Sequence, residues 1–238
     1  MKQLSNRGFT LIELMITLAM TGIIVAAVYS VYTVQSRAYG KQEQVADIQQ
    51  TLSAAVFLMT RDIRMAGFQP EDGKGSKPGF TAATATTLTF GKDLDGDGTL
   101  VGSEETTYEF NNAAKIADRK LTRNIGSGDQ LLGDNIEAVE FLYTLANGDS
   151  TRTPSTAEMG KIRAVTVSVL GIAAYPDSSF DNQNTYIPGS NRSGVTLSDS
   201  DSKATTWPNG MASTAPKDHY RRRMLITTIN CRNMGLSL

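Results

Sequence analysis

The hydrophobic pattern of the first 66 residues changes from continuous to periodic. From Leu14 to Ser36 no side chain is charged, and a helix of about 23 residues can cross the ~30 Å hydrocarbon core of a bilayer. Beyond Arg37, apolar residues recur at steps of three or four, which places them on one face of a helix. This apolar face comprises Val45, Ile48, Leu52, Val56, Met59 and Ile63. The pattern predicts a membrane-spanning segment followed by an amphipathic one.

The two segments are predicted to form one helix. No proline occurs between Phe9 and Gln69, and proline is the residue that most strongly breaks a helix interior. We therefore expect a helix from about residue 10 to about residue 66. Its transmembrane half covers residues 9–36, and its amphipathic half covers residues 37–66.

After the helix the pattern becomes that of short strands. Residues 71–85 are rich in Gly, Lys, Ser and Pro and are expected to form a loop. Apolar and polar positions then alternate, as in half-buried strands. The predicted strands are 86–90, 106–110, 136–145, 162–172 and 224–231, with a short candidate at 119–123. The expected fold is α+β, with the distal half of the helix packed on an antiparallel sheet and residues 67–238 forming a β-rich globular domain.

A long polar segment at 176–219 interrupts the strands. It is rich in Ser, Asn, Asp and Thr, and it holds the single tryptophan, Trp207, and the single histidine, His219. Loops longer than about 15 residues are usually functional or disordered. Two interpretations stay open: a variable, partly ordered surface loop, or a loop that binds a specific partner. The run Arg221–Arg223 that follows is expected to be a solvated strand edge that discourages aggregation, or else to contact acidic neighbours or lipid headgroups.

Composition limits the classes of function. The 238 residues carry 23 Lys and Arg against 24 Asp and Glu, so the balance indicates no nucleic-acid partner. Cys231 is the only cysteine, which excludes an intrachain disulfide, and we expect it to be a small buried hydrophobe. The sequence contains no phosphate loop, no C-x-x-C and no Ser/His/Asp arrangement beyond chance, so we do not expect an enzyme.

Residues 93–104 match the twelve-position pattern D-x-D-x-D-G-x₅-E of a calcium loop. Calcium prefers six to eight oxygen ligands, and this spacing supplies carboxylates around a sharp turn at Gly98. The expected ligands are Asp93, Asp95, Asp97, the carbonyl of Thr99 and Glu104. Because the flanking segments are predicted strands, we expect a structural Ca²⁺ site in a hairpin and not an EF-hand pair. An ordinary acidic turn is the alternative.

The N-terminus has a basic stub, residues 1–8, before the apolar run. A standard signal peptide is cut after its apolar core, whereas here the small residue Gly8 precedes it. Glu13 lies within the apolar helix, where a carboxylate is costly and usually functional. An uncleaved signal anchor is the plain alternative. By the positive-inside rule, the basic stub stays in the cytoplasm and the remainder is exported.

The segment Arg7-Gly8-Phe9-Thr10-Leu11-Ile12-Glu13 resembles the class III leader of type IV prepilins and pseudopilins. The resemblance implies a type IV pilin-like fold and cleavage between Gly8 and Phe9 by a prepilin peptidase. It also implies N-methylation of Phe9 and retention of the helix as an anchor. In this family, Glu13 would neutralise the amino terminus of a neighbouring subunit during assembly.

Two further segments resemble PilW-type minor pilins: residues 61–68 at the expected helix end, and the terminal residues 221–233. The resemblance implies a minor pilin that primes or caps the type IV pilus, with other minor pilins, the major pilin and the inner-membrane assembly machinery as partners. The chain would lie in the inner membrane before assembly and at the cell surface afterwards. J-type minor pseudopilins of type II secretion share a similar helix end and are the alternative. A major pilin, or a DNA- or surface-binding pilin, is a third hypothesis.

Overall fold

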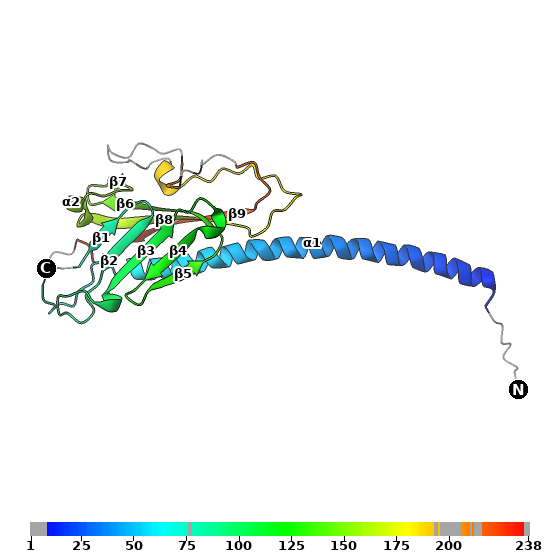
Figure 1. The fold of residues 1–238 in the computed structure, drawn as a ribbon, viewed down its shortest axis with the longest axis horizontal. Coiled ribbons are helices and arrows are strands. Elements are labelled where there is room, and N and C mark those ends of the chain that lie inside the picture. The colour runs from blue at the N-terminus through cyan, green and yellow to red at the C-terminus, as the bar shows by residue number, and fades with distance from the viewer. Residues whose placement is uncertain are drawn as a thin grey trace, which may run out of the picture. The chain divides into compact units, whose positions relative to one another are not determined.

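The computed structural model of the chain describes residues 9–75, 78–192, 195, 206–209, 211 and 216–235. The chain divides into two compact units between residues 43 and 44. The first unit contains the N-terminal part of helix α1, which spans Leu11–Ile63. The second unit contains the remainder of α1 and the strands of the described residues (Figure 1).

Helix α1 begins and ends close to the predicted limits. It starts one residue after, and stops three residues before, the positions expected from the pattern. In the second unit its buried side chains follow the predicted apolar face, except that Val45 is only half buried. The chain turns away at residues 64–67, where Gly67 has a φ of 77°. A glycine in this left-handed conformation is a common helix terminator.

The first sheet is a five-stranded antiparallel meander in the order β1-β2-β3-β4-β5 (Figure 1). Its strands are β1 Phe80–Ala83, β2 Thr87–Gly91, β3 Glu105–Asn111, β4 Lys120–Asn124 and β5 Asp129–Gly133. Strands β2, β3 and β4 lie within one residue of their predicted limits. The prediction of a loop over 71–85 is wrong at β1, and β5 was not predicted. Both strands are short and lack a run of alternating apolar residues, which explains why the pattern does not reveal them.

The second sheet has four antiparallel strands in the order β7-β6-β8-β9. Its strands are β6 Ile136–Leu145, β7 Ser150–Thr151, β8 Ile162–Ile172 and β9 Arg222–Asn230, and the one-turn helix α2 (Thr156–Met159) precedes β8. Strands β6 and β8 coincide with the prediction, and β9 begins two residues earlier. The expected single sheet is therefore two sheets.

One hydrophobic core joins both sheets to the second part of α1. The core includes Met59 and Ile63 of the helix, together with apolar residues of β2, β3, β4, β6 and β8. Tyr143 of β6 ties the sheets together, because its hydroxyl donates to the carbonyl oxygens of Thr84 (2.8 Å) and Thr87 (3.1 Å). Its ring also lies edge-on to Phe80 of β1, with the ring centres 6.3 Å apart.

A second, smaller core lies among residues of β6, β8 and the 176–219 segment. It contains Ala138 and Leu170 of the second sheet, and Tyr186 and Trp207 of the segment. Trp207 is only 1% exposed, and its indole N–H donates to the carbonyl oxygen of Tyr186 at 2.8 Å. The interpretation of this segment as a surface loop is therefore wrong for Tyr186 and Trp207. Residues 193–194, 196–205, 210 and 212–215 lie outside the described residues.

Candidate assembly site and calcium loop

The first turn of α1 is capped by the residue pair Thr10 and Glu13. The amide and hydroxyl of Thr10 both donate to the Glu13 carboxylate at 2.9 Å, and the Glu13 amide donates back to the Thr10 hydroxyl at 3.3 Å. This reciprocal arrangement is a capping box, which satisfies amides left free at a helix start. Glu13 therefore has a structural role in the isolated chain besides the predicted one in assembly. Gly8 lies outside the described residues, and Phe9 is exposed.

The first unit presents an apolar surface. Large apolar side chains are exposed at Phe9 and along α1 from Leu11 to Val34. Such a continuous surface is typical of segments that contact a membrane or another protein. By length and composition, α1 can cross a membrane. These observations agree with the predicted anchoring role of residues 9–36.

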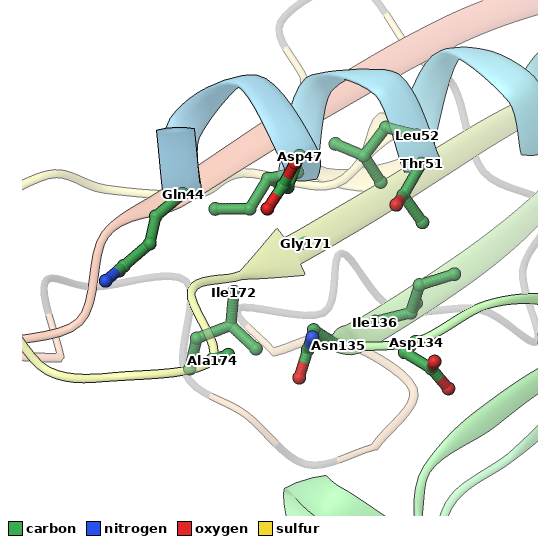
Figure 2. A pocket seen from close by; sticks show the side chains of 11 residues that line it. Gln44, Asp47, Thr51, Leu52, Asp134, Asn135, Ile136, Gly171, Ile172 and Ala174 are labelled. Carbon is green, nitrogen blue, oxygen red and sulfur yellow. The ribbon is translucent and has the colours of Figure 1, made fainter. Parts of the chain in front are cut away.

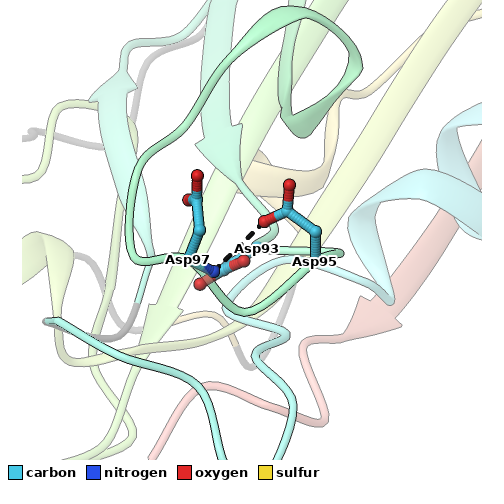
Figure 3. Close-up of side chains that lie close together, drawn as sticks. All are labelled: Asp93, Asp95 and Asp97. Atoms are coloured by element: carbon cyan, nitrogen blue, oxygen red, sulfur yellow. Dashed lines mark hydrogen bonds between the residues drawn. The ribbon is translucent and has the colours of Figure 1, made fainter.

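Residues 93–104 connect the paired strands β2 and β3 as predicted, and they bring three carboxylates together (Figure 3). Oxygens of Asp93, Asp95 and Asp97 all lie within 4.8 Å of one another. Two oxygens bound to one Ca²⁺ at 2.3–2.6 Å are at most about 5 Å apart. The three aspartates therefore have a spacing that one calcium ion can bridge.

Backbone amides hold the loop in this shape. The buried Asp93 carboxylate accepts from the amides of Gly96 (2.6 Å) and Gly98 (3.1 Å). Both glycines have φ near 80°, and a Cβ on Gly98 would lie 2.5 Å from the Lys74 carbonyl oxygen. The turn at position six of the loop therefore requires glycine, as the calcium pattern predicts.

Thr99 and Glu104 take part in the loop through other bonds. The hydroxyl and amide of Thr99 donate to Asp97 at 2.7 Å, and these bonds hold the pKa of Asp97 below its usual range. The buried Glu104 carboxylate accepts from the amides of Leu94 (2.8 Å) and Val101 (3.1 Å). Glu104 is not among the three carboxylates that cluster, so its role as a bidentate ligand stays a prediction.

A buried ion pair joins the end of α1 to the first sheet. Asp62 lies 2.6 Å from Arg123 of β4, and it also accepts the hydroxyl of Tyr108 of β3 at 2.8 Å. Burial opposes ionisation of Asp62, but the hydrogen bonds from Tyr108 and Arg123 outweigh it and lower the pKa of this carboxyl. Asp62 therefore pairs with residues of the first sheet and not with solvent. Arg61 contacts Asp62 from the surface and is 58% exposed.

The run Arg221–Arg223 is not uniformly solvated. Arg222 is buried and binds Glu137 of β6 through two nitrogens, at 2.5 and 3.0 Å, and Asp218 at 2.6 Å. Arg221 pairs with Asp177 at 2.8 Å. The expectation of a solvated strand edge is therefore wrong for two of the three arginines, which neutralise acidic residues of β6 and the 176–219 segment. Only Arg223 is exposed.

Hydrogen bonds between buried polar residues attach the 176–219 segment to the second sheet. The fully buried Glu140 of β6 accepts from the hydroxyl (2.5 Å) and the amide (3.0 Å) of Ser190. Next to it, the hydroxyl of Ser168 of β8 accepts the amide of Gly189 at 3.0 Å. Alternation predicts that Glu140 shares a face with Ala138 and Leu142, but it does not predict that this face is covered.

A cavity of about 60 Å³ lies between α1 and the ends of β6 and β8. Figure 2 shows Gln44 and Asp47 on the helix side, and Asp134 and Asn135 before β6. Ligand pockets usually measure roughly 300–1,000 Å³, so this cavity is too small to indicate a site for a drug-sized molecule.

Cys231 follows β9 and is buried, as predicted. Burial raises the pKa of its thiol to about 12. A thiol that stays protonated at neutral pH is a poor nucleophile, so Cys231 acts as a core residue.

Comparison with known proteins identifies the N-terminal motif. Residues 4–29 match the family model described as the prokaryotic N-terminal methylation motif. No curated protein matches the sequence significantly. Among solved structures, the chain is similar to a type IV-like pilin from Thermus thermophilus, with 13% identity, a TM-score of 0.44, and coverage of 78% of this chain and 97% of that one. An identity and a TM-score this low support no conclusion about function.

The chain therefore carries the N-terminal methylation motif of prokaryotic prepilin-type proteins. The motif ends within a long apolar helix, and the distal part of this helix packs on antiparallel sheets. This combination of motif, helix and sheets agrees with the prepilin-type architecture that the leader sequence predicts.

Proposed function

We propose that this chain is a PilW-type minor pilin that enters the type IV pilus and promotes its assembly by priming or capping the fibre. The observation that carries the proposal is the methylation motif at residues 4–29. It supports the proposed processing junction at Gly8–Phe9, which directly precedes an apolar helix that bears Glu13. These features support a structural protein and not an enzyme.

The proposed sequence of events follows from this junction. A prepilin peptidase removes residues 1–8 and methylates Phe9 while α1 anchors the chain in the inner membrane. The chain then joins other minor pilins and the major pilin through the inner-membrane assembly machinery and reaches the cell surface. Glu13 neutralises the amino terminus of the adjacent subunit, because neither charge is stable alone among apolar helices.

Residues 61–68, which resemble PilW-type minor pilins, include one residue with a clear packing role, Asp62. Asp62 is the one buried charged residue of α1 among the described residues, and it binds Arg123 and Tyr108. The segment therefore has a clear structural task, which is to fix the helix to the globular unit. The single cysteine also favours a minor pilin, since many major pilins close a C-terminal loop with a disulfide.

We also propose that the 93–104 loop binds a structural Ca²⁺. The support is the twelve-position pattern together with the clustered oxygens of Asp93, Asp95 and Asp97. Bound calcium would stabilise the β2–β3 connection by neutralising adjacent carboxylates. Thr99 and Glu104 complete the proposed ligand set.

Deletion of the gene in its native host tests the proposed function. We expect few or no surface pili by electron microscopy, normal secretion of exported enzymes, and recovery of pili when the wild-type gene is returned. Normal pili with enzymes trapped in the periplasm would contradict a minor pilin and support the J-type pseudopilin of type II secretion. The helix-end segment 61–68, which resembles both classes, is the reason to measure both outcomes.

A further inference from the structure

Strand β9 is an unusually regular edge strand. It pairs with β8 over nine consecutive residue pairs, without a register shift, and it ends the order β7-β6-β8-β9. The other sheet edges are less suited to pairing. Strand β7 has two residues, β1 has four with a shifted register, and β5 has five, also with a shift. Of the four sheet edges formed by the described residues, only β9 is both long and regular.

Beyond Arg223, the described residues of β9 lack the usual protection of an edge. Edge strands expose unpaired N–H and C=O groups, and proteins commonly block them with charges, prolines or bulges. Residues 224–230 read Met-Leu-Ile-Thr-Thr-Ile-Asn, with no charge and no proline. Within the described part of the chain, two backbone hydrogen bonds continue the pairing of β9 with β8 beyond the ends of the strand. The amide of Ala173 donates to the carbonyl oxygen of Arg221, and the amide of Cys231 donates to that of Arg163.

Packing holds this edge in a fixed shape. Leu225 packs on the main core and Met224 on the second core, and Ile229 is buried. The strand is thus fastened on both faces of the sheet while Ile226 and Thr227 stay half exposed. A rigid edge binds an added strand at a lower entropic cost than a flexible one.

Two cations without partners flank the apolar edge. Arg223 and Arg232 are exposed, and within the described residues neither guanidinium forms a hydrogen bond or an ion pair. Their neighbours Arg221 and Arg222 are both neutralised by acidic residues. The edge therefore presents an apolar centre with positive charge at each end.

We propose that the outer edge of β9 is a docking site for an extended segment of a partner protein, apolar or β-branched in its centre and acidic at both ends. The segment would add a fifth strand to the second sheet, a common mode of peptide recognition in which main-chain hydrogen bonds supply affinity. A second copy of β9 is disfavoured because it would bring further arginines to the same site. This inference does not depend on the proposed place of the chain in a pilus.

The test titrates purified full-length protein in detergent into a fluorescein-labelled peptide of alternating Thr and Val with two glutamates at each end. Binding is measured by fluorescence anisotropy. One control peptide carries lysines in place of the glutamates, and a second is the acidic peptide with alternate amides N-methylated. We expect the acidic peptide to bind at least about threefold more tightly than the lysine peptide, the size that two exposed ion pairs supply. N-methylation should abolish binding, because it removes the donors that pair with β9.

The double variant Arg223→Glu/Arg232→Glu should reverse the order of the two charged peptides. A matched variant, Lys115→Glu/Lys120→Glu, makes the same change in net charge at exposed residues away from β9 and should leave the order unchanged. Equal thermal melting of all three proteins shows that they are folded. Absence of binding, binding that survives N-methylation, or an unchanged order in the β9 variant would each overturn the proposal. Self-association that competes with the peptide would overturn it too, since the occupant would then be a second copy.

Discussion

The carboxylate of Asp62 lies 2.6 Å from the guanidinium of Arg123, and this buried pair joins the last turn of α1 to strand β4. The hydroxyl of Tyr108 on β3 donates to the same carboxylate oxygen at 2.8 Å. One side chain of the helix thereby contacts two strands of the first sheet. Because both charges are removed from water, each depends on the other for its solvation.

Replacement of Asp62 should destabilise the globular unit strongly. Asp62→Ala leaves Arg123 buried without a counter-charge, which typically costs ~3–5 kcal/mol. The measurement is the free energy of unfolding in urea, followed by circular dichroism. Arg61→Ala is the matched control, since Arg61 is mostly exposed and its pair with Asp62 should contribute less than about 1 kcal/mol. Similar losses in both variants would contradict a dominant role for the buried pair.

The lowered pKa of Asp62 predicts that the stability of the globular unit depends on pH. The pKa of Asp62 is lower in the folded state than in the unfolded chain. The ionised carboxylate therefore contributes fully to the free energy of unfolding above the ordinary Asp pKa of ~3.9, and this contribution is lost as the pH falls through the folded-state pKa. Asp62→Asn cannot titrate. We therefore expect the stability of the wild type to fall more steeply below about pH 4 than that of Asp62→Asn. Parallel curves of unfolding free energy against pH would refute this assignment.

Replacement of Gly8 should block maturation. A β-branched side chain at the proposed cleavage junction, as in Gly8→Val, should prevent the peptidase from cutting before Phe9. Intact-mass measurement should give a wild-type chain beginning at N-methylated Phe9 and a variant chain beginning at Met1. A wild-type mass that still includes residues 1–8 would contradict the proposed processing.

Two substitutions of Glu13 separate capping from charge neutralisation. Glu13→Gln retains an oxygen that can accept from Thr10, whereas Glu13→Ala loses both the cap and the charge. If the charge is what assembly requires, both variants should be cleaved and inserted but should co-purify poorly with partner pilins. Normal co-purification of Glu13→Gln would assign Glu13 to helix capping alone.

Calcium should stabilise the folded chain if the 93–104 loop binds it. At free Ca²⁺ of ~100 times Kd, binding to the folded state alone contributes about 2.7 kcal/mol. The melting temperature should therefore rise with Ca²⁺ and fall with chelator. Asp95→Ala/Asp97→Ala should abolish the difference without unfolding the sheet, while Asp118→Ala, at an exposed aspartate elsewhere, should retain it. Equal melting temperatures with and without Ca²⁺ would leave only the acidic-turn interpretation.

The elements that were predicted correctly are those that depend on residues close together in the sequence. Strands β6 and β8 were predicted to the residue because each is a long alternating run that a polar residue, Asn135 or Lys161, precedes. The spacing of Asp93, Asp95 and Asp97 correctly predicted that their carboxylates cluster. The cap at Thr10 was missed although its signal, Thr followed three residues later by Glu, is present in the sequence.

Contacts between distant segments could not be predicted in the same way. Glu140 has the spacing of a solvent-facing residue, yet it is buried by Ser190, 50 residues away. Trp207 likewise packs against Ala138 and Leu170 of the second sheet, and Arg222 binds Glu137 of β6. A periodic pattern shows which residues share a face of a strand, but it does not show whether a distant loop covers that face.

The anchoring of α1 also has a mechanical meaning. With a single cysteine, the globular unit has no covalent cross-link between its helix and its sheets. A pulling force applied along residues 44–63 can reach the strands only through the chain after Ile63 or through side-chain contacts such as the Asp62–Arg123 bond. Tensile strength at this joint therefore depends on a charge pair that acid can neutralise, and a subunit that resists shear at neutral pH should release its helix at lower force in acid.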